Sequence, residues 1–351
     1  MEKNTLLQPD LPLATLGAAL GGEIKTSPET FQVTEIRPER PDGDGEHWIL
    51  TIEKSGMSTE QVVDWLARAC QCSRAAIGYA GLKDRWALAI QEFSVHLPKR
   101  ELPDLTPLLP ASLRILASAR HRRKIRIGHL TGNHFRICLR GCHSDQARQQ
   151  HAATTAAWIM RHGFPNYFGP QRFGRLGDNA QTGMAMLAGQ RVQGNRKQRG
   201  LYLSAVRSEL FNRVLANRLD GGYFTQLLDG DIAQLQGRSA CFSVTTALVE
   251  HPRFAAGEIH PTGPLFGRDL MQPTGAPGDM EAHVAAAEAE TIARLVDFAV
   301  QGERRALRVI PTDLSLAWEG DDLWFQFSLP RGSYATSLLR EFMQSAHEKP
   351  W

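Results

Sequence analysis

The chain has 351 residues, which is long for one compact core and favours two domains or one domain with a large insertion. Hydrophobic residues make up 42% and charged residues 22%, as in soluble globular proteins, and no apolar run of about 18 residues predicts a membrane span. The net charge of +3 does not by itself point to a partner, and five cysteines without a CxxC pair predict reduced thiols in a cytoplasmic protein rather than a metal site.

The first half of the chain predicts strands mixed with helices. A turn at Pro41–Gly45 separates two alternating segments, and Ser58 with Gln61 has the spacing of a capping box. A loop at 81–86 is expected to lead into a further strand. The expected strands are 30–36, 46–53, 87–97, 114–118, 124–130 and 134–140, and a helix is expected over 144–162, closed by Gly163.

The middle of the chain predicts helices, and its end returns to strands. Residues 166–200 have little periodicity, and the Pro- and Gly-rich segment 251–280 predicts an irregular crossing. The expected helices are 201–219, 281–300 and one from the cap Ser333 to about residue 346. The expected strands are 306–310, 313–318 and 323–329. Because regular βα alternation is missing, the order predicts an α+β fold whose sheet is interrupted by an insertion.

Basic residues are concentrated in two regions. Residues 111–140 contain eight Lys or Arg and no acid, and residues 161–218 contain ten basic against two acidic residues. Acidic residues gather near 39–64 and 278–290. One such run would be read as a solvated surface, but two of this size favour a nucleic-acid partner.

The segment YAGLKDRWALAIQ at 79–91 carries the most informative chemistry. Asp84 lies between Lys83 and Arg85 in a loop before a strand. Nearby positive charge favours an ionised carboxylate, which can act as a nucleophile or a general base. The alternative is a turn residue within a surface ion-pair cluster.

Two further segments combine aromatic, amide and cationic side chains. In 128–140, Gly132 and Asn133 predict a tight turn, and Asn133 and Phe135 could hold an extruded base, although a plain hairpin with a core Phe is the alternative. In 166–174 (NYFGPQRFG), the aromatic residues favour a packed domain junction, and Arg172 could contact phosphate.

The fourth segment, PRGSYATSLLR at 330–340, predicts a strand, a Gly turn and a capped helix. Tyr334 is expected in the first turn of that helix, where backbone amides could also attract phosphate. An ordinary helix cap is the alternative.

Together, these segments resemble the TruD family of tRNA pseudouridine synthases. Residues 81–91 (GLKDRWALAIQ) fit the family motif GxKDxxAxxxQ, and residues 166–174 fit NYFGxQRFG. The motif KxxPExF is found from Lys25 to Phe31, and GNxF from Gly132 to Phe135. The family segment GSFATS is GSYATS at 332–337, so Tyr334 replaces Phe. The matches extend from residue 25 to residue 340 and are more specific together than one short pattern.

The resemblance implies a pseudouridine-synthase catalytic domain with a mixed, mainly antiparallel sheet flanked by helices and interrupted by an inserted α/β TruD-specific domain. The expected boundaries are 1–160 and 306–351 for the catalytic domain and 161–305 for the insertion. It implies isomerisation of a uridine in tRNA, at position 13 in the D-stem region, without a cofactor or a metal.

The resemblance also assigns the site residues. Asp84 is the expected catalytic residue, and Lys25, with Arg340 as second candidate, is expected to hold it ionised. The expected substrate-binding residues are Phe31, Asn133, Phe135, Tyr334, Lys25 and Arg340. The basic runs and the segment 166–174, rather than the resemblance, predict the contacts to the RNA backbone, which are Arg122, Arg123, Lys124, Arg126, Arg172, Arg196 and Lys197.

Three other functions remain open at this point: a non-catalytic RNA-binding protein on the same scaffold, an RNA methyltransferase, and a protein-interaction scaffold. The sequence implies no protein partner, and the absence of a heptad seam favours a monomer.

Overall fold

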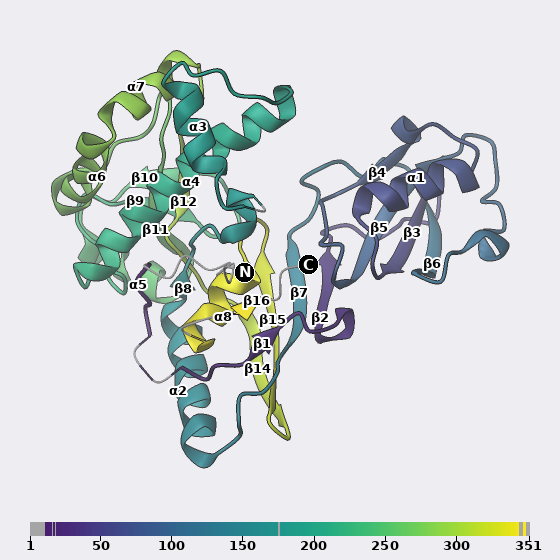
Figure 1. Cartoon of the computed structure of the whole chain (residues 1–351), viewed down its shortest axis with the longest axis horizontal. Helices are drawn as coiled ribbons and strands as arrows, with labels where there is room; N and C mark the ends of the chain where they lie inside the picture. The colour runs from purple at the N-terminus through teal and green to yellow at the C-terminus, as the bar shows by residue number, and fades with distance from the viewer. Residues whose placement is uncertain (1–10, 16, 18, 175, 344–346, 349–351) are drawn as a thin grey trace. The chain divides into compact units, whose positions relative to one another are not determined.

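The computed structural model describes residues 11–15, 17, 19–174, 176–343 and 347–348, and the chain forms two compact units (Figure 1). Unit 1 contains Gln150–Ile310 and Ser333–His347, together with the described part of the N-terminal segment up to Gly21. Unit 2 contains Gly22–Gln149 and Pro311–Gly332.

An eight-stranded sheet forms the framework of unit 2. Its order is β14-β15-β7-β2-β5-β3-β6, with β4 also paired to β5, and every pair is antiparallel except β2 with β5. Buried and exposed side chains alternate along β15, as a sheet with one covered face requires. The strands are β2 Phe31–Ile36, β3 His47–Lys54, β4 Ile77–Tyr79, β5 Leu88–His96, β6 Leu113–His121, β7 Gly132–Leu139, β14 Thr312–Glu319 and β15 Asp322–Pro330.

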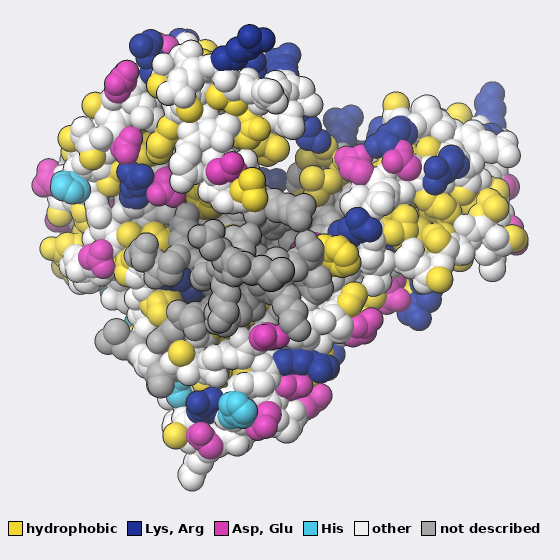
Figure 2. All heavy atoms as spheres, viewed as in Figure 1, with side chains coloured by type: hydrophobic (Ala, Val, Ile, Leu, Met, Phe, Trp, Pro, Cys, Tyr) yellow, Lys and Arg dark blue, Asp and Glu magenta, His cyan; other side chains and the backbone are white. Residues whose placement is uncertain are grey.

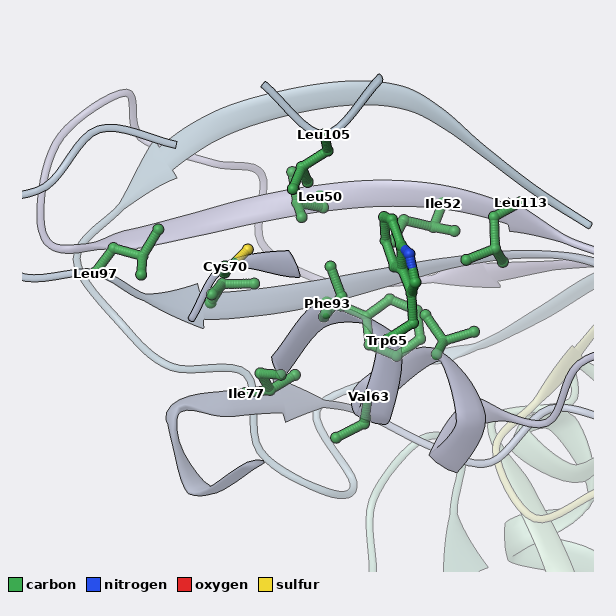
Figure 3. Close-up of a cluster of buried hydrophobic side chains, with 13 residues drawn as sticks. Leu50, Ile52, Val63, Trp65, Cys70, Ile77, Phe93, Leu97, Leu105 and Leu113 are labelled. Atoms are coloured by element: carbon green, nitrogen blue, oxygen red, sulfur yellow. The ribbon is translucent and has the colours of Figure 1, made fainter. Parts of the chain in front are cut away.

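Helix α1 (Thr59–Ala69) covers the part of this sheet that β3 and β5 form (Figure 3). Its start is the predicted capping box, in which Ser58 Oγ accepts from the backbone N of Gln61 at 3.2 Å. Trp65 and Leu66 of the helix pack in one cluster with Phe93. Each fully buried side chain of this size contributes roughly 1.5–3 kcal/mol to folding. The cluster therefore stabilises the part of the sheet that β3 and β5 form, from which the adjoining loops leave.

Unit 1 is helix-rich and contains a four-stranded antiparallel sheet in the order β10-β9-β11-β12, with a separate pair β8 and β13. The 25-residue helix α4 (Arg196–Asp220) is its central element, because its buried side chains belong to two of the core clusters. The other helices are α2 Gln146–His162, α3 Asn179–Leu187, α5 Ala247–Ala255, α6 Gly275–Ala287, α7 Ala289–Asp297 and α8 Ala335–Met343. The strands of unit 1 are β8 Phe164–Pro165, β9 Ile232–Leu235, β10 Cys241–Ser243, β11 Ile259–Leu265, β12 Glu303–Ala306 and β13 Arg308–Val309. Of the two remaining short strands, β1 Glu23–Ile24 belongs to unit 2, and β16 is His347–Glu348.

Two predictions for unit 2 are wrong. Residues 124–130 form a loop rather than a strand. In a strand, Ile125 and Ile127 would lie on the same face, but Ile125 is buried and Ile127 is 79% exposed. Gly132 and Asn133 are not a turn but the first residues of β7, where they pair with β2 and β15.

The middle of the chain also differs from the prediction. The expected irregular segment 251–280 contains the end of α5, the buried strand β11 and the start of α6. Pairing of β11 with both β9 and β12 outweighs the two prolines within it, which is a tertiary effect on local propensity. The helix expected over 281–300 is two helices, α6 and α7. The end of the last predicted helix, at 344–346, lies outside the described residues.

The α+β fold with a mixed, mainly antiparallel sheet flanked by helices is confirmed. The boundaries of a catalytic domain (1–160 and 306–351) and an inserted domain (161–305) stay a prediction. Over the described part of the chain, every helix is too short or too polar to cross a lipid bilayer.

Candidate active site

The loop that carries Asp84 joins β4 to β5, and polar side chains hold the backbone of its first half, at Gly81 and Lys83. Lys83 donates its backbone N–H to Thr59 Oγ1 at 3.0 Å, and Thr59 Oγ1 donates to Gln91 Oε1 at 3.1 Å. Gln91 Nε2 in turn donates to the carbonyl of Gly81. The Gln at the end of the GxKDxxAxxxQ motif therefore holds the loop in place from inside β5.

The Asp84 carboxylate has two partners. Lys25 Nζ donates to its Oδ2 at 3.2 Å, and the backbone N–H of Trp86 donates to its Oδ1 at 3.1 Å, which is an Asx turn. The Asp84 side chain keeps 28% of its surface exposed, whereas Lys25 keeps 12%. A carboxylate that is oriented, paired with a cation and still accessible is suited to act as a nucleophile or a base.

Lys25 reaches Asp84 from an unusual backbone conformation. Its φ of 59° lies in the left-handed region, which is uncommon for a residue with a Cβ. Its Nζ also lies 4.9 Å from the centre of the Phe31 ring. The ion pair joins residues that are 59 positions apart in the chain, so it depends on the assembled sheet.

Lys54 lies beneath the loop and was not predicted as a site residue. It is 1% exposed, and its Nζ donates to the carbonyl oxygens of Asp84 and Met57, each at 2.7 Å. Burial lowers the pKa of Lys54 from 10.5 to about 8. The sequence signal was its position: Lys54 has the same parity in the strand as Leu50 and Ile52, whose side chains are in the core.

A second buried pair connects the loop to β2. Lys83 Nζ contacts Glu35 Oε2 at 2.6 Å, with side-chain exposures of 6% and 1%. Burial raises the pKa of Glu35, and the charge of Lys83 opposes that shift. Glu35 is directly opposite Asn133 in the β2–β7 pair. Within the described residues, Glu35 Oε1 and Asn133 Oδ1 are buried and accept no hydrogen bond.

The two phenylalanines of the predicted site are in the same region of the sheet, but both are buried. Phe31 is 6% and Phe135 is 7% exposed. The Phe135 ring stacks on Phe327 with a centroid distance of 5.4 Å. Packing in the core is therefore established for Phe135, and its contact with a substrate stays a prediction.

The basic segment 122–130 lies next to the Asp84 loop. Its backbone is anchored by Ile125 N, which donates to Ser94 Oγ at 2.9 Å, and by Gly128 N, which donates to the carbonyl of Ala80 at 2.8 Å. Arg122 pairs with Asp44 at 3.0 Å, and Lys124 binds the carbonyl of Ala75. Arg123 and Arg126 are exposed.

Five of the predicted residues lie in unit 1: Arg172, Arg196, Lys197, Tyr334 and Arg340. Arg172 donates to Ser204 Oγ at 3.0 Å and to Tyr334 Oη at 3.2 Å, so its guanidinium is held by side chains. Tyr334 precedes α8 and packs at the edge of the buried Phe168 ring, which agrees with a packed role for the NYFGPQRFG aromatics.

Arg340 is also in unit 1, and it binds the N-terminal segment. It is 7% exposed and donates to the carbonyls of Leu11 and Pro12. Burial lowers its pKa. The ion pair of Asp84 is with Lys25, the first of the two cations considered. Arg196 and Lys197 are exposed in the first turn of α4.

No cluster of three or more His, Cys, Asp or Glu side chains in the described part of the chain could hold a metal ion. The five cysteines are free thiols, and burial raises the pKa of Cys138 to about 11.

Comparisons with known proteins agree with these motifs. The family model described as tRNA pseudouridine synthase D (TruD) matches residues 12–194 and 192–342. A protein of Methylococcus capsulatus named tRNA pseudouridine synthase D is 42% identical over 95% of this chain and 94% of its own length. One of the same name from Aeromonas salmonicida is 40% identical over 93% and 92%. A solved structure from Methanosarcina mazei, assigned as tRNA pseudouridine synthase D, has the same fold, with a TM-score of 0.79, 22% identity and 99% coverage of both chains. The chain belongs to the TruD family of tRNA pseudouridine synthases.

Proposed function

We propose that this protein isomerises a uridine of tRNA to pseudouridine, with Asp84 as the catalytic residue and uridine 13 in the D-stem region as the target. The observation that carries the proposal is the Asp84 carboxylate, which is accessible, paired with Lys25 and held by an Asx turn in a braced loop. Family membership supports the same reaction.

The reaction is an isomerisation in which no atom is gained or lost. The N1–C1′ bond of the uridine breaks, the uracil turns, and C5 joins C1′ while the proton from C5 passes to N1. Asp84 acts either as a nucleophile at C1′ or as a base on the ribose. No redox step or group transfer occurs, so we expect no cofactor and no metal.

The chain's own residues prepare Asp84 for either role. The ammonium of Lys25 favours the ionised carboxylate and fixes its direction. Lys54 binds the carbonyl of the same residue from below, so the backbone cannot turn away from the site. Arg340, the second candidate cation, donates to backbone carbonyls of the N-terminal segment. It would contact the substrate only after giving up those hydrogen bonds.

We further propose that the uridine is extruded before it reacts, because its glycosidic bond cannot be rearranged within a base stack. Unstacking costs a few kcal/mol, which base contacts recover. The unpartnered Asn133 Oδ1 is suited to accept a hydrogen bond from the uracil. Phe31, Phe135 and Tyr334 are the aromatic candidates for stacking.

The RNA backbone is proposed to bind the exposed cations. Arg123 and Arg126 face solvent on the loop beside Asp84, together with Arg122 and Lys124. In unit 1 the proposed contacts are Arg172, Arg196 and Lys197. The binding constant should fall steeply as salt rises, because each neutralised phosphate releases counterions. The working form is proposed to be a cytoplasmic monomer without a protein partner.

The test is incubation of the protein with an unmodified tRNA transcript in the absence of any cofactor, followed by chemical mapping of pseudouridine. The matched control is the same transcript with cytidine at position 13. Product at position 13 of the first transcript alone supports the proposal. Tight binding without product from any tRNA would favour the non-catalytic RNA-binding alternative.

A further inference from the structure

A cavity of about 550 Å³ lies in unit 1, and its lining contains none of the residues proposed to touch the uridine. It lies where the loop between α3 and α4 faces the end of α7, and Figure 2 shows dark-blue Lys and Arg side chains gathered over that end of the unit. Its size falls within the range of sites that bind small molecules or nucleotides, about 300–1,000 Å³. Its lining includes Met186, Val192, Leu203, Phe298 and three arginines.

The lining divides into an apolar wall and a cationic rim. Phe298 follows α7 and leaves 51% of its surface exposed, which is unusual for an aromatic side chain beside a core. Arg191, Arg196 and Arg199 supply the rim. None of these three guanidinium groups has an ion-pair partner among the residues that the structure describes.

The positions of these cations are unfavourable for the helix itself. Arg196, Lys197 and Arg199 occupy the first turn of α4, which has no acidic residue, and they face the positive end of the helix dipole. The capping box of Asn195 and Gln198 satisfies two backbone N–H groups at this helix end, but no acidic residue of the first turn offsets the three cations. A local rule that is broken in this way is expected at a binding site. An anion in the cavity would offset the charge of these cations beside the positive end of the helix dipole.

Part of the cavity lining lies on packed helices, with Met186 on α3 and Leu203 on α4. Leu187, Val206 and Leu295 pack in one buried cluster that joins α3, α4 and α7 directly behind it. Gly189, with φ of 83°, ends α3 in a left-handed conformation and turns the chain toward the rim. The helical part of the lining is therefore held by core packing, and residues 189–192 of the lining belong to the loop between α3 and α4.

We infer that this cavity is an RNA subsite that takes one unpaired nucleotide of the tRNA, with the base against Phe298 and the phosphate among Arg191, Arg196 and Arg199. An apolar, aromatic wall beside unpaired guanidinium groups matches a base with its phosphate, and neither a bare anion nor an apolar ligand uses both. The inference rests on the proposed function, because it takes tRNA as the partner. It adds a binding site that is separate from the Asp84 loop and acts on affinity alone.

The experiment measures the Kd of a tRNA transcript and the rate of pseudouridine formation at saturating protein for the full-length chain and its variants. Phe298→Ala should raise the Kd about 10-fold, and Phe298→Tyr should restore it, because stacking needs only an aromatic ring. Arg199→Gln should raise the Kd and lower the slope of log Kd against log salt by about one, and Arg199→Lys should keep the slope. The saturated rate should not change in any of them.

Matched controls are Arg238→Gln and Tyr223→Ala, exposed residues of unit 1 that do not line the cavity. Kd values for Phe298→Ala and Arg199→Gln within twofold of these controls would overturn the inference while leaving the proposed function intact. A wild-type protein that makes no pseudouridine would refute the proposed function, and the Kd comparison would still decide the subsite.

Discussion

Replacing Lys54 by Met removes a buried charge under the Asp84 loop and keeps most of the side-chain volume. In the folded protein, burial lowers the pKa of this ammonium from 10.5 to about 8. A shift of that size corresponds to about 3 kcal/mol against the charged form. At pH 7 the variant regains this free energy but leaves two partly buried carbonyls, those of Asp84 and Met57, without this donor, at up to about 1–3 kcal/mol each. The two effects offset each other near neutral pH.

The dependence on pH separates these effects. Between pH 8 and 10.5 the unfolded chain holds a proton on Lys54 that the folded chain has lost, so the folded state gains stability as pH rises through that window. Below pH 8 both states are protonated, and the burial penalty is present in full. The wild type should therefore gain about 2 kcal/mol over Lys54→Met between pH 7 and pH 9.5.

The assay is urea unfolding of both proteins at pH 7, 8, 9 and 9.5, with Lys99→Met as an exposed-lysine control that should run parallel to the wild type. All other titrating groups are shared, so the difference between the two proteins isolates Lys54. A difference in unfolding free energy that stays constant from pH 7 to 9.5 would refute the reasoning that burial controls this group.

Three further predictions concern the pairs around the site. Lys83→Met should lower the free energy of unfolding by about 3–5 kcal/mol at pH 7, because buried Glu35 loses its cation. In urea unfolding, adding Glu35→Gln should recover part of that loss. Equal losses in the single and double variants would contradict this prediction. Lys25→Met should lower the saturated rate about 10- to 100-fold with an unchanged Kd for tRNA, and Lys25→Arg should be partly active; an unchanged rate would remove Lys25 from the mechanism. Tyr334→Phe should lower the free energy of unfolding by about 0.5–1.5 kcal/mol, because the hydrogen bond from Arg172 is lost. The saturated rate of pseudouridine formation should not change. A tenfold slower reaction would show that the hydroxyl acts on the substrate.

The sequence predicted those elements whose burial follows strand or helix periodicity. The capping box at Ser58 and the alternation that defines β2, β3 and β15 are local signals, and the structure has them. Residues 124–130 show the limit of that reasoning. Their Ile and cationic residues alternate as in a strand, but Ile127 faces solvent, and only the tertiary environment reveals that no partner strand is available there.

The sequence likewise predicted only some of the residues that form the candidate site. The motif residues placed Asp84 in a loop and identified Lys25 as its candidate cation, but the distance between them depends on the register of the assembled sheet. Lys54 was missed because the predicted strand stopped at residue 53, and Glu35 was missed because it lay within the predicted strand 30–36 and was assigned no role. Both charged side chains are buried here. Lys54 binds the carbonyl of Asp84, and Glu35 accepts a hydrogen bond from Lys83 of the same loop. A charge at core parity next to a motif loop is therefore a sequence signal for a supporting residue.

The measurement that tests the central claim most directly is the single-turnover rate of pseudouridine formation by wild type and Asp84→Asn on the same tRNA transcript, with the Kd of each measured in parallel. The Asn variant keeps the side-chain shape and the Asx turn but removes the ionisable carboxylate. The account predicts product at one uridine with the wild type, no product with Asp84→Asn, and equal Kd values. Product formation by Asp84→Asn at the wild-type rate would contradict it.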